Sequence, residues 1–381
     1  MKFIHLSDLH IGKRVNEFSM IEDQKYILLE ILSIIEKEGA DAVLISGDIY
    51  DKSQPSNEAV NLFDEFIFRL SKLNVKTYII SGNHDSAEKL SFAYRFIEKS
   101  NVFISPVYNG EIKKHTLFDE WGKVNIYMLP FIKPINVKLQ FEDEEISSYT
   151  DAIKVAIKHM DVDENERNII LSHQFVTGAI RSDSEEISLG GTDNVDVCAY
   201  DGFDYVALGH IHSPQKLVRD TVRYSGTPLK YSFSECRHNK SVTVVEMKEK
   251  GNVSITQIPL VPMRDMVEIK DKYDEVMAKS FYENLNADKD YFHITLTNEE
   301  DVADALLKLR TVYKNIMKLD YDNKRTRAAA TVGATASQSK SPLELFDELY
   351  EMQNGAKPSE EQEAVLLSLI KEIWEGEQCD R

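Results

Sequence analysis

The stretch AVLISGDIYD, residues 42–51, decides the fold of this chain. Its first five residues are small or apolar and lack polar alternation, which is typical of a strand covered on both faces. Gly47 follows as a tight turn, and the carboxylates of Asp48 and Asp51 come directly after it. A buried strand that ends this way places polar groups at the edge of a sheet, where α/β proteins bind their ligands.

The same pattern recurs over residues 1–262. Further strands are expected at residues 2–6, 76–81, 125–130, 168–172, 205–208, 241–247 and 253–258, and helices at residues 21–38 and 58–73. The later strands lack intervening helices, so we expect a sheet that is parallel in part and antiparallel at its end. The fold class is therefore α/β, with helices and strands in layers.

Pro259 and Pro262 separate this domain from a smaller α+β unit, residues 263–323. Strands are expected there at residues 267–270, 291–297 and 315–321, and helices at residues 274–279 and 299–312. Asn298 is the expected N-cap of the last helix.

The end of the chain differs in composition. Residues 324–340, KRTRAAATVGATASQSK, predict a flexible linker because they lack acidic residues and periodicity. Residues 341–381 predict two amphipathic helices, which are too short to be stable alone. They would pack on their own domain or on a partner, and their place beyond a linker favours a partner.

Composition limits the function. The 381 residues include 45 Lys and Arg against 64 Asp and Glu, a formal charge of −19. This argues against a protein that coats nucleic acid through net positive charge, but not against an enzyme with a local basic site. The start of the chain has no signal-peptide pattern and no apolar run is long enough to span a membrane, so a cytoplasmic protein is expected. Cys198, Cys236 and Cys379 are too few and scattered for a disulfide framework or a zinc finger.

Five polar clusters each follow an expected strand. They are Asp8-x-His10, Gly47-Asp48-x-x-Asp51, Gly82-Asn83-His84-Asp85, Ser172-His173-Gln174 and Gly209-His210-x-His212. Carboxylate, imidazole and amide oxygen without thiolate suit divalent ions such as manganese, iron or zinc. Two ions ~3.5–4 Å apart need a bridging group, and Asp48 is the candidate bridge.

Each cluster alone has an ordinary structural explanation. Asp8-x-His10 fits a solvated loop, Gly-Asn-His-Asp fits a turn, and Asp51 fits a turn residue or a supporting partner equally well. Chance is a poor explanation for five such clusters in this order, all of them after strands.

The ordered set resembles the calcineurin-like metallophosphoesterases. The longer stretches HLSDLHIGK, SGDIYDKSQPS, SGNHDS, LSHQFVTGA with SDSE after it, and LGHIHSPQ are similar to the nuclease subunits of bacterial double-strand-break repair complexes. The resemblance implies a layered core with mixed sheets, a small α+β capping domain that contacts DNA, and a helical partner-binding tail.

It also implies roles for the clustered residues. One metal ion would be held by Asp8, His10, Asp48 and His212, and a second by Asp48, Asn83, His173 and His210. His84 is similar to the family's catalytic histidine, which contacts the scissile phosphate and stabilises charge or protonates the leaving oxygen. The implied metal is manganese. Asp85 is a candidate for orienting His84, and Lys13, Arg14 and Arg181 fit either DNA contacts or solvated charges.

The implied function is a metal-dependent DNA nuclease in repair, replication and recombination, exonucleolytic on double-stranded ends and endonucleolytic on single strands and hairpins. Its implied partner is an SMC-like ATPase, in a 2:2 heterotetramer built on a nuclease homodimer. The apolar stripe of residues 58–73 fits dimer contacts or a fully buried helix. A small-molecule phosphodiesterase or phosphatase, or a non-catalytic scaffold on the same fold, stays open as an alternative.

Overall fold

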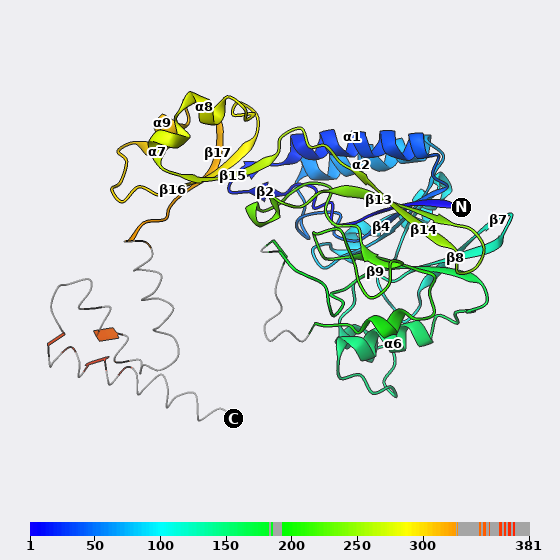
Figure 1. Ribbon diagram of the computed structural model, residues 1–381. Helices are drawn as coiled ribbons and strands as arrows, with labels where there is room; N and C mark the ends of the chain where they lie inside the picture. Colours follow the sequence, from blue (N-terminus) through cyan, green and yellow to red (C-terminus); the bar gives the residue numbers. More distant parts are fainter. Residues whose placement is uncertain are drawn as a thin grey trace.

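The computed structural model describes residues 1–182, 184–185 and 193–324, and scattered positions after residue 324. Figure 1 shows these residues as two bodies, a large layered one and a small one joined to its edge. The predictions of a linker at residues 324–340 and of helices at residues 341–381 lie almost wholly outside the described residues.

The first large sheet is mixed. Its strand order is β14-β13-β1-β4-β5-β6, in which β1, β4, β5 and β6 run parallel and β13 and β14 are antiparallel to their neighbours. The strands are β1 (Lys2–Leu6), β4 (Ala42–Ser46), β5 (Lys76–Ile80), β6 (Val102–Ile104), β13 (Ser241–Met247) and β14 (Val253–Pro259).

A second six-stranded sheet has the order β11-β12-β10-β9-β8-β7. Its four central strands are parallel, and both edge strands pair antiparallel. The strands are β7 (Lys113–Asp119), β8 (Gly122–Met128), β9 (Arg167–His173), β10 (Tyr205–Gly209), β11 (Gln215–Lys216) and β12 (Val222–Tyr224).

The two sheets pack face to face, and helices cover their outer faces (Figure 1). Phe3 and Leu44 of the first sheet share a buried cluster with Leu171 and Ala207 of the second. The outer faces are covered by α1 (Ile21–Glu38) and α2 (Asn57–Lys72) on one side and by α5 (Pro134–Lys138) and α6 (Tyr149–Lys158) on the other. Because both faces of each central strand are covered, the strands read as continuous apolar runs.

The small body is a parallel three-stranded sheet of β15 (Met266–Asp271), β16 (Tyr291–Leu296) and β17 (Asn315–Tyr321). Short helices cover it: α7 (Tyr273–Val276), α8 (Lys279–Tyr282) and α9 (Ala305–Leu309). It is joined to the large body at Asp23 of α1, whose buried carboxylate accepts hydrogen bonds from Arg264 Nε at 3.0 Å and Tyr291 Oη at 2.8 Å.

The remaining elements are short. They are the hairpin β2 (Arg14–Val15) and β3 (Phe18–Ser19), the helices α3 (Ala87–Leu90) and α4 (Tyr94–Ile97), and the 3₁₀ turns η1 (Glu98–Ser100), η2 (Val197–Tyr200) and η3 (Phe233–Glu235). Within the described part of the chain, no helix is both long and apolar enough to cross a membrane.

The α/β class and mixed sheets are confirmed. Five predicted elements begin and end as observed in the structure: residues 2–6, 21–38, 42–46, 241–247 and 315–321. The strand pattern by itself led us to expect one sheet, whereas the core strands form two, as the family resemblance implied. The helix predicted at residues 299–312 is wrong over its first half, because α9 begins at Ala305. Asn298 instead accepts a hydrogen bond from the Tyr273 amide at 2.8 Å, so it joins the start of α7 to the end of β16. Two short helices, α7 and α8, replace the one predicted at residues 274–279.

Candidate metal centre

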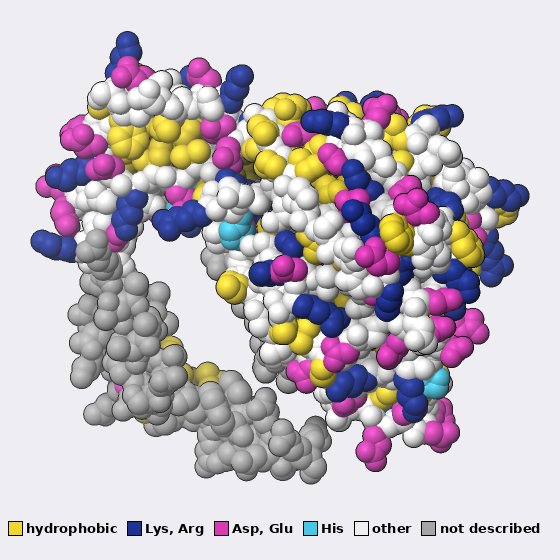
Figure 2. Space-filling view, turned by 45° about the vertical axis from the view of Figure 1, so that its right-hand side comes forward, with side chains coloured by type: hydrophobic (Ala, Val, Ile, Leu, Met, Phe, Trp, Pro, Cys, Tyr) yellow, Lys and Arg dark blue, Asp and Glu magenta, His cyan; other side chains and the backbone are white. Residues whose placement is uncertain are grey.

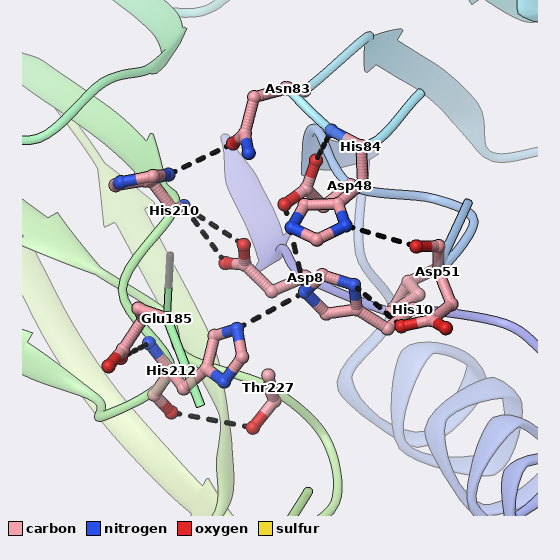
Figure 3. A network of polar contacts seen from close by, with 12 residues as sticks. Asp8, His10, Asp48, Asp51, Asn83, His84, Glu185, His210, His212 and Thr227 are labelled. Carbon is pink, nitrogen blue, oxygen red and sulfur yellow. Dashed lines mark hydrogen bonds and ion pairs between the residues drawn. The ribbon is translucent and has the colours of Figure 1, made fainter. Parts of the chain in front are cut away.

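The five polar clusters lie together at the carboxyl ends of β1, β4, β5, β9 and β10. These strands come from both sheets, so the site lies where the two sheets meet (Figure 3). Backbone hydrogen bonds join the first two loops: the Asp8 amide donates to the Gly47 carbonyl and the His10 amide to the Asp48 carbonyl, each at 3.0 Å.

The backbone of the site is strained. Asp8, His10, Asp48 and His210 have φ of 53°, 43°, 50° and 106°, in the left-handed region that residues with side chains rarely adopt. Such conformations persist only where the surrounding structure enforces them, and they concentrate at functional sites. The sequence pattern did not reveal this strain.

Asp85 fastens two of the loops together. Its carboxylate accepts hydrogen bonds from the amides of Gly82 at 2.9 Å, Ile49 at 3.1 Å and Tyr50 at 3.0 Å. Burial, followed by the charge of Asp48, raises the pKa of Asp85 to about 6. Asp85 therefore fixes the loop that carries His84 against the loop that carries Asp48.

Glycine is required at two close approaches beside the site, one between the two sheets and one between neighbouring loops of the first sheet. A Cβ atom on Gly209 would lie 1.9 Å from the Ser46 carbonyl oxygen, and one on Gly82 would lie 2.1 Å from Asp48 Oδ1. Both contacts are far inside van der Waals distance, and the Gly209 contact is with backbone that cannot rotate away.

We expect Gly209→Ala to destabilise the chain by about 3 kcal/mol or more, because the added methyl forces β10 away from β4. Gly202→Ala is the matched control, since its Cβ would meet no atom closer than 3.6 Å. The free energy of unfolding from urea titration measures both. Equal stability of the two variants would contradict the close approach.

The first group of donor atoms is formed by Asp8, His10 and His212, which lie close enough to share one cation. His10 Nε2 and His212 Nε2 are 3.1 Å apart. Donor atoms bound at about 2.1 Å and at right angles are about 3 Å apart, so this spacing fits an ion between them.

The second group surrounds the amide oxygen of Asn83. Asn83 Oδ1 lies 3.0 Å from both His173 Nε2 and His210 Nδ1. Asp48 Oδ2 is 3.3 Å from His173 Nε2 and 3.6 Å from His10 Nε2, so this carboxylate lies between the two groups. The structure thus brings together all seven candidate ligands, with a central carboxylate placed as a bridge would be.

The pKa values of the donor groups are shifted in different directions. Burial raises the pKa of Asp8 to about 6 and lowers that of His210 to about 3. Burial, the largest single effect, would lower the pKa of His173, but the charge and hydrogen bond of Asp48 and the charge of Asp8 together raise this pKa to about 9. Neutral imidazole is the form that binds metal, so His210 is ready to bind and His173 must first release a proton.

His84 lies at the rim of the donor groups and is half-buried. Its backbone amide donates a hydrogen bond to Asp48 Oδ1 at 2.9 Å. Its ring stands edge-on to the ring of His10, with 4.8 Å between the two ring centres. Nδ1 is 3.0 Å from the Asp51 carbonyl oxygen, which can only accept, so Nδ1 carries the proton in this hydrogen bond. That contact fixes the ring orientation seen in Figure 3.

A buried support for His212 was missed from the sequence. The His212 amide donates to Glu185 Oε1 at 2.7 Å, and His212 Nδ1 lies 2.7 Å from Ser184 Oγ. Glu235, fully buried, contacts the same Nδ1 at 3.3 Å and pairs with buried Lys240 at 2.5 Å. Ser184 and Glu185 belong to the SDSE stretch and could have been suspected, whereas nothing local marks Glu235 and Lys240. Such partners hold a ligand histidine in one orientation.

The basic residues near the loops are already paired. Lys13 Nζ lies 2.7 Å from Asp51 Oδ1, and Arg181 lies 2.9 Å from Asp193 Oδ2. Arg14 donates to the Glu17 carbonyl. Asp51 therefore supports the site twice, through its carbonyl to His84 and through its carboxylate to Lys13.

Comparison with known proteins identifies two families along the chain. A family model described as calcineurin-like phosphoesterase matches residues 1–214, and one described as type 5 capsule protein repressor C-terminal domain matches residues 262–354. Among solved structures, a dimetal phosphatase from Danio rerio aligns with a TM-score of 0.39 and 11% identity, covering 68% of this chain and 99% of that one. TT1561 of Thermus thermophilus aligns with a TM-score of 0.38 and 11% identity, covering 67% and 98%.

Two curated relatives are named as the D component of the nuclease SbcCD. The protein from Staphylococcus epidermidis is 34% identical over 323 residues, covering 84% of this chain and 85% of the relative. The protein from Staphylococcus saprophyticus is 34% identical over 325 residues and covers 84% of each. The chain belongs to the calcineurin-like phosphoesterase family and, within it, to the SbcD family of nuclease subunits.

Proposed function

We propose that this chain is the metal-dependent nuclease subunit of an SbcCD complex and hydrolyses phosphodiester bonds in DNA. The observation that carries the proposal is the convergence of seven carboxylate, imidazole and amide donors around the central carboxylate of Asp48. Names of the curated relatives support the substrate and the complex.

The site would hold two divalent ions. We assign the first to Asp8, His10, Asp48 and His212, and the second to Asp48, Asn83, His173 and His210. The donor chemistry suits hard-to-borderline divalent ions, and manganese is our choice among them. When bound, such ions activate water as a nucleophile and offset charge on the phosphoryl group.

The chain's own residues would prepare the site for this chemistry. Asp48 fixes the separation of the two donor groups, and the buried support behind His212 keeps its Nε2 directed at His10. His84, held through Nδ1 by the Asp51 carbonyl, would stabilise charge on the scissile phosphate or protonate the leaving oxygen.

A partner protein would supply much of the affinity for DNA. Basic and acidic side chains are interspersed over the face in Figure 2, and the formal charge is −19, so the chain alone should bind DNA weakly. We propose SbcC, an SMC-like ATPase, as the partner, in a 2:2 assembly. Exposed Val60 and Phe68 of α2 favour a homodimer contact on that helix. We propose the same domain division as from the sequence: a nuclease domain at residues 1–262, a DNA-contacting capping unit at residues 263–323, a linker at residues 324–340 and a partner-binding tail at residues 341–381.

The test is incubation of the purified chain with end-labelled linear duplex and manganese, with and without SbcC and ATP. We expect cleavage that requires the metal, stops with a chelator and quickens with the partner. Cleavage of a chromogenic diester but never of DNA would favour a small-molecule phosphodiesterase, and inactivity on both would favour a scaffold.

Deletion of residues 341–381 should leave manganese-dependent cleavage of single strands within about twofold of the full chain, because all candidate ligands precede this segment. The same deletion should abolish association with SbcC, measured by gel filtration of the mixed proteins. Co-elution of the shortened chain with SbcC would show that another surface binds the partner.

A further inference from the structure

A cavity of about 190 Å³ opens beside the second donor group. Asn83 and His210 of the second donor group line it, together with the aromatic rings of Phe131 and Phe175. Phe131 follows β8 and Phe175 follows β9, two adjacent parallel strands, so both rings come from the same sheet edge as the donors. A ligand bound at Asn83 and His210 would therefore have aromatic surface directly beside it.

Two buried polar atoms at this cavity have no hydrogen-bond partner within the described residues. They are His210 Nε2, on the ring edge opposite the nitrogen that faces Asn83, and Asp193 Oδ1. In Figure 3 this nitrogen of His210 points away from the other donors. Unpaired buried polar atoms are costly, so their presence along one cavity indicates a ligand that supplies partners.

The aromatic wall is held in place. The Arg181 guanidinium lies 3.5 Å from the centre of the Phe175 ring and is tied to Asp193 Oδ2. The Phe131 amide donates to the Ser81 carbonyl at 2.9 Å, and its ring stands edge-on to His173. Lys133, which is exposed, lies on the same lining and is suited to a phosphate.

We propose that this cavity is a nucleoside subsite, which binds the sugar and base of the nucleotide next to the phosphate being cut. This rests on the proposed function, since it requires a nucleotide chain as substrate. The aromatic walls of Phe131 and Phe175 contact the base, the unpaired atoms of His210 and Asp193 hydrogen-bond it or its sugar, and Lys133 pairs with the next phosphate. Aromatic contact accepts any base, so the subsite positions DNA without reading its sequence.

The test compares Phe175→Ala and Phe131→Ala with Phe118→Ala, an exposed phenylalanine outside the cavity. Cavity variants should cleave duplex ends roughly 5- to 100-fold more slowly, the usual effect of losing one base–aromatic contact, and the control should match the unaltered chain. Phe175→Leu keeps most of the apolar volume and should still be slow, which separates loss of stacking from misfolding.

Abasic nucleotides make the test specific. Two substrates are compared, one with an abasic nucleotide directly before the cut phosphate and the other with an abasic nucleotide directly after it. The unaltered chain should cleave one of the two substrates roughly 5- to 100-fold more slowly than intact DNA. Phe175→Ala should show less than a twofold further loss on that substrate, because the contact is already gone. A 2-aminopurine at that position should be quenched on binding to the His84→Gln variant and stay bright when Phe175→Ala is added.

Two results would overturn the subsite while leaving the nuclease assignment intact. One is normal cleavage by both cavity variants, and the other is an abasic nucleotide that slows the unaltered chain and Phe175→Ala by the same factor. Absence of DNA cleavage by the unaltered chain would instead overturn the proposed function.

Discussion

Replacement of Asp48 by asparagine should lower DNA cleavage by roughly a thousandfold and remove the stabilisation that manganese gives to the folded chain. Asparagine keeps the size of the side chain but loses the negative charge and one of the two equivalent oxygens. The loss should be larger than for any other ligand, because Asp48 lies between the two donor groups and also accepts the His84 amide at 2.9 Å.

The metal-free chain offers an independent measurement of the same change. Burial is the largest single effect on the pKa of His173 and lowers it, and the charge of Asp48 is the largest of the effects that together raise this pKa to about 9. In Asp48→Asn this charge is gone, so the pKa of His173 should fall below its ordinary value, as an NMR titration of the imidazole would show. A pKa that stays near 9 would mean that another group controls His173.

Asp220→Asn is the matched control, since Asp220 is exposed and pairs only with Lys216 in the described structure. Melting temperature with increasing manganese reports binding without activity, because a ligand at about 100 times its Kd stabilises the folded state by about 2.7 kcal/mol. The control should respond like the unaltered chain. A normal manganese response in Asp48→Asn would rule out its role as a shared ligand.

The sequence was sufficient to predict that the five polar clusters converge, because the relevant signals are local. Each ligand follows a short apolar strand, and strands of an α/β fold end at a common edge, so convergence follows from topology. The support behind His212 was not predictable in the same way. Glu235 and Lys240 are recognisable only once the fold brings them to the back of that imidazole, far from it in sequence.

The errors have a similar cause. Residues 299–312 carry a helical pattern, yet helix begins only at Ala305, after Asp304 at φ 54°. Asn298 would have capped a longer helix, but its side chain is used by the amide of Tyr273 across the small sheet. A tertiary hydrogen bond thus overrides a local capping preference.

Replacement of His84 by glutamine should slow DNA cleavage by about 10²- to 10⁴-fold while leaving manganese binding unchanged. Glutamine can still donate to the Asp51 carbonyl, so the loop should keep its shape, but it cannot transfer a proton near neutral pH. His159→Gln is the control, since His159 lies outside the site, stacked on Phe141. Manganese-dependent melting and DNA binding should be the same in all three proteins.

The two roles open to His84 predict different substrate dependence. If His84 protonates the leaving oxygen, a thymidine 5′-phosphate ester with a nitrophenolate leaving group should be cleaved almost normally by His84→Gln, because nitrophenolate leaves without a proton. If His84 stabilises charge on the phosphoryl oxygens, the ester and DNA should lose activity by the same factor, because that charge develops with either leaving group. Full activity of the variant on both substrates would exclude both roles and leave His84 as a support for Asp48.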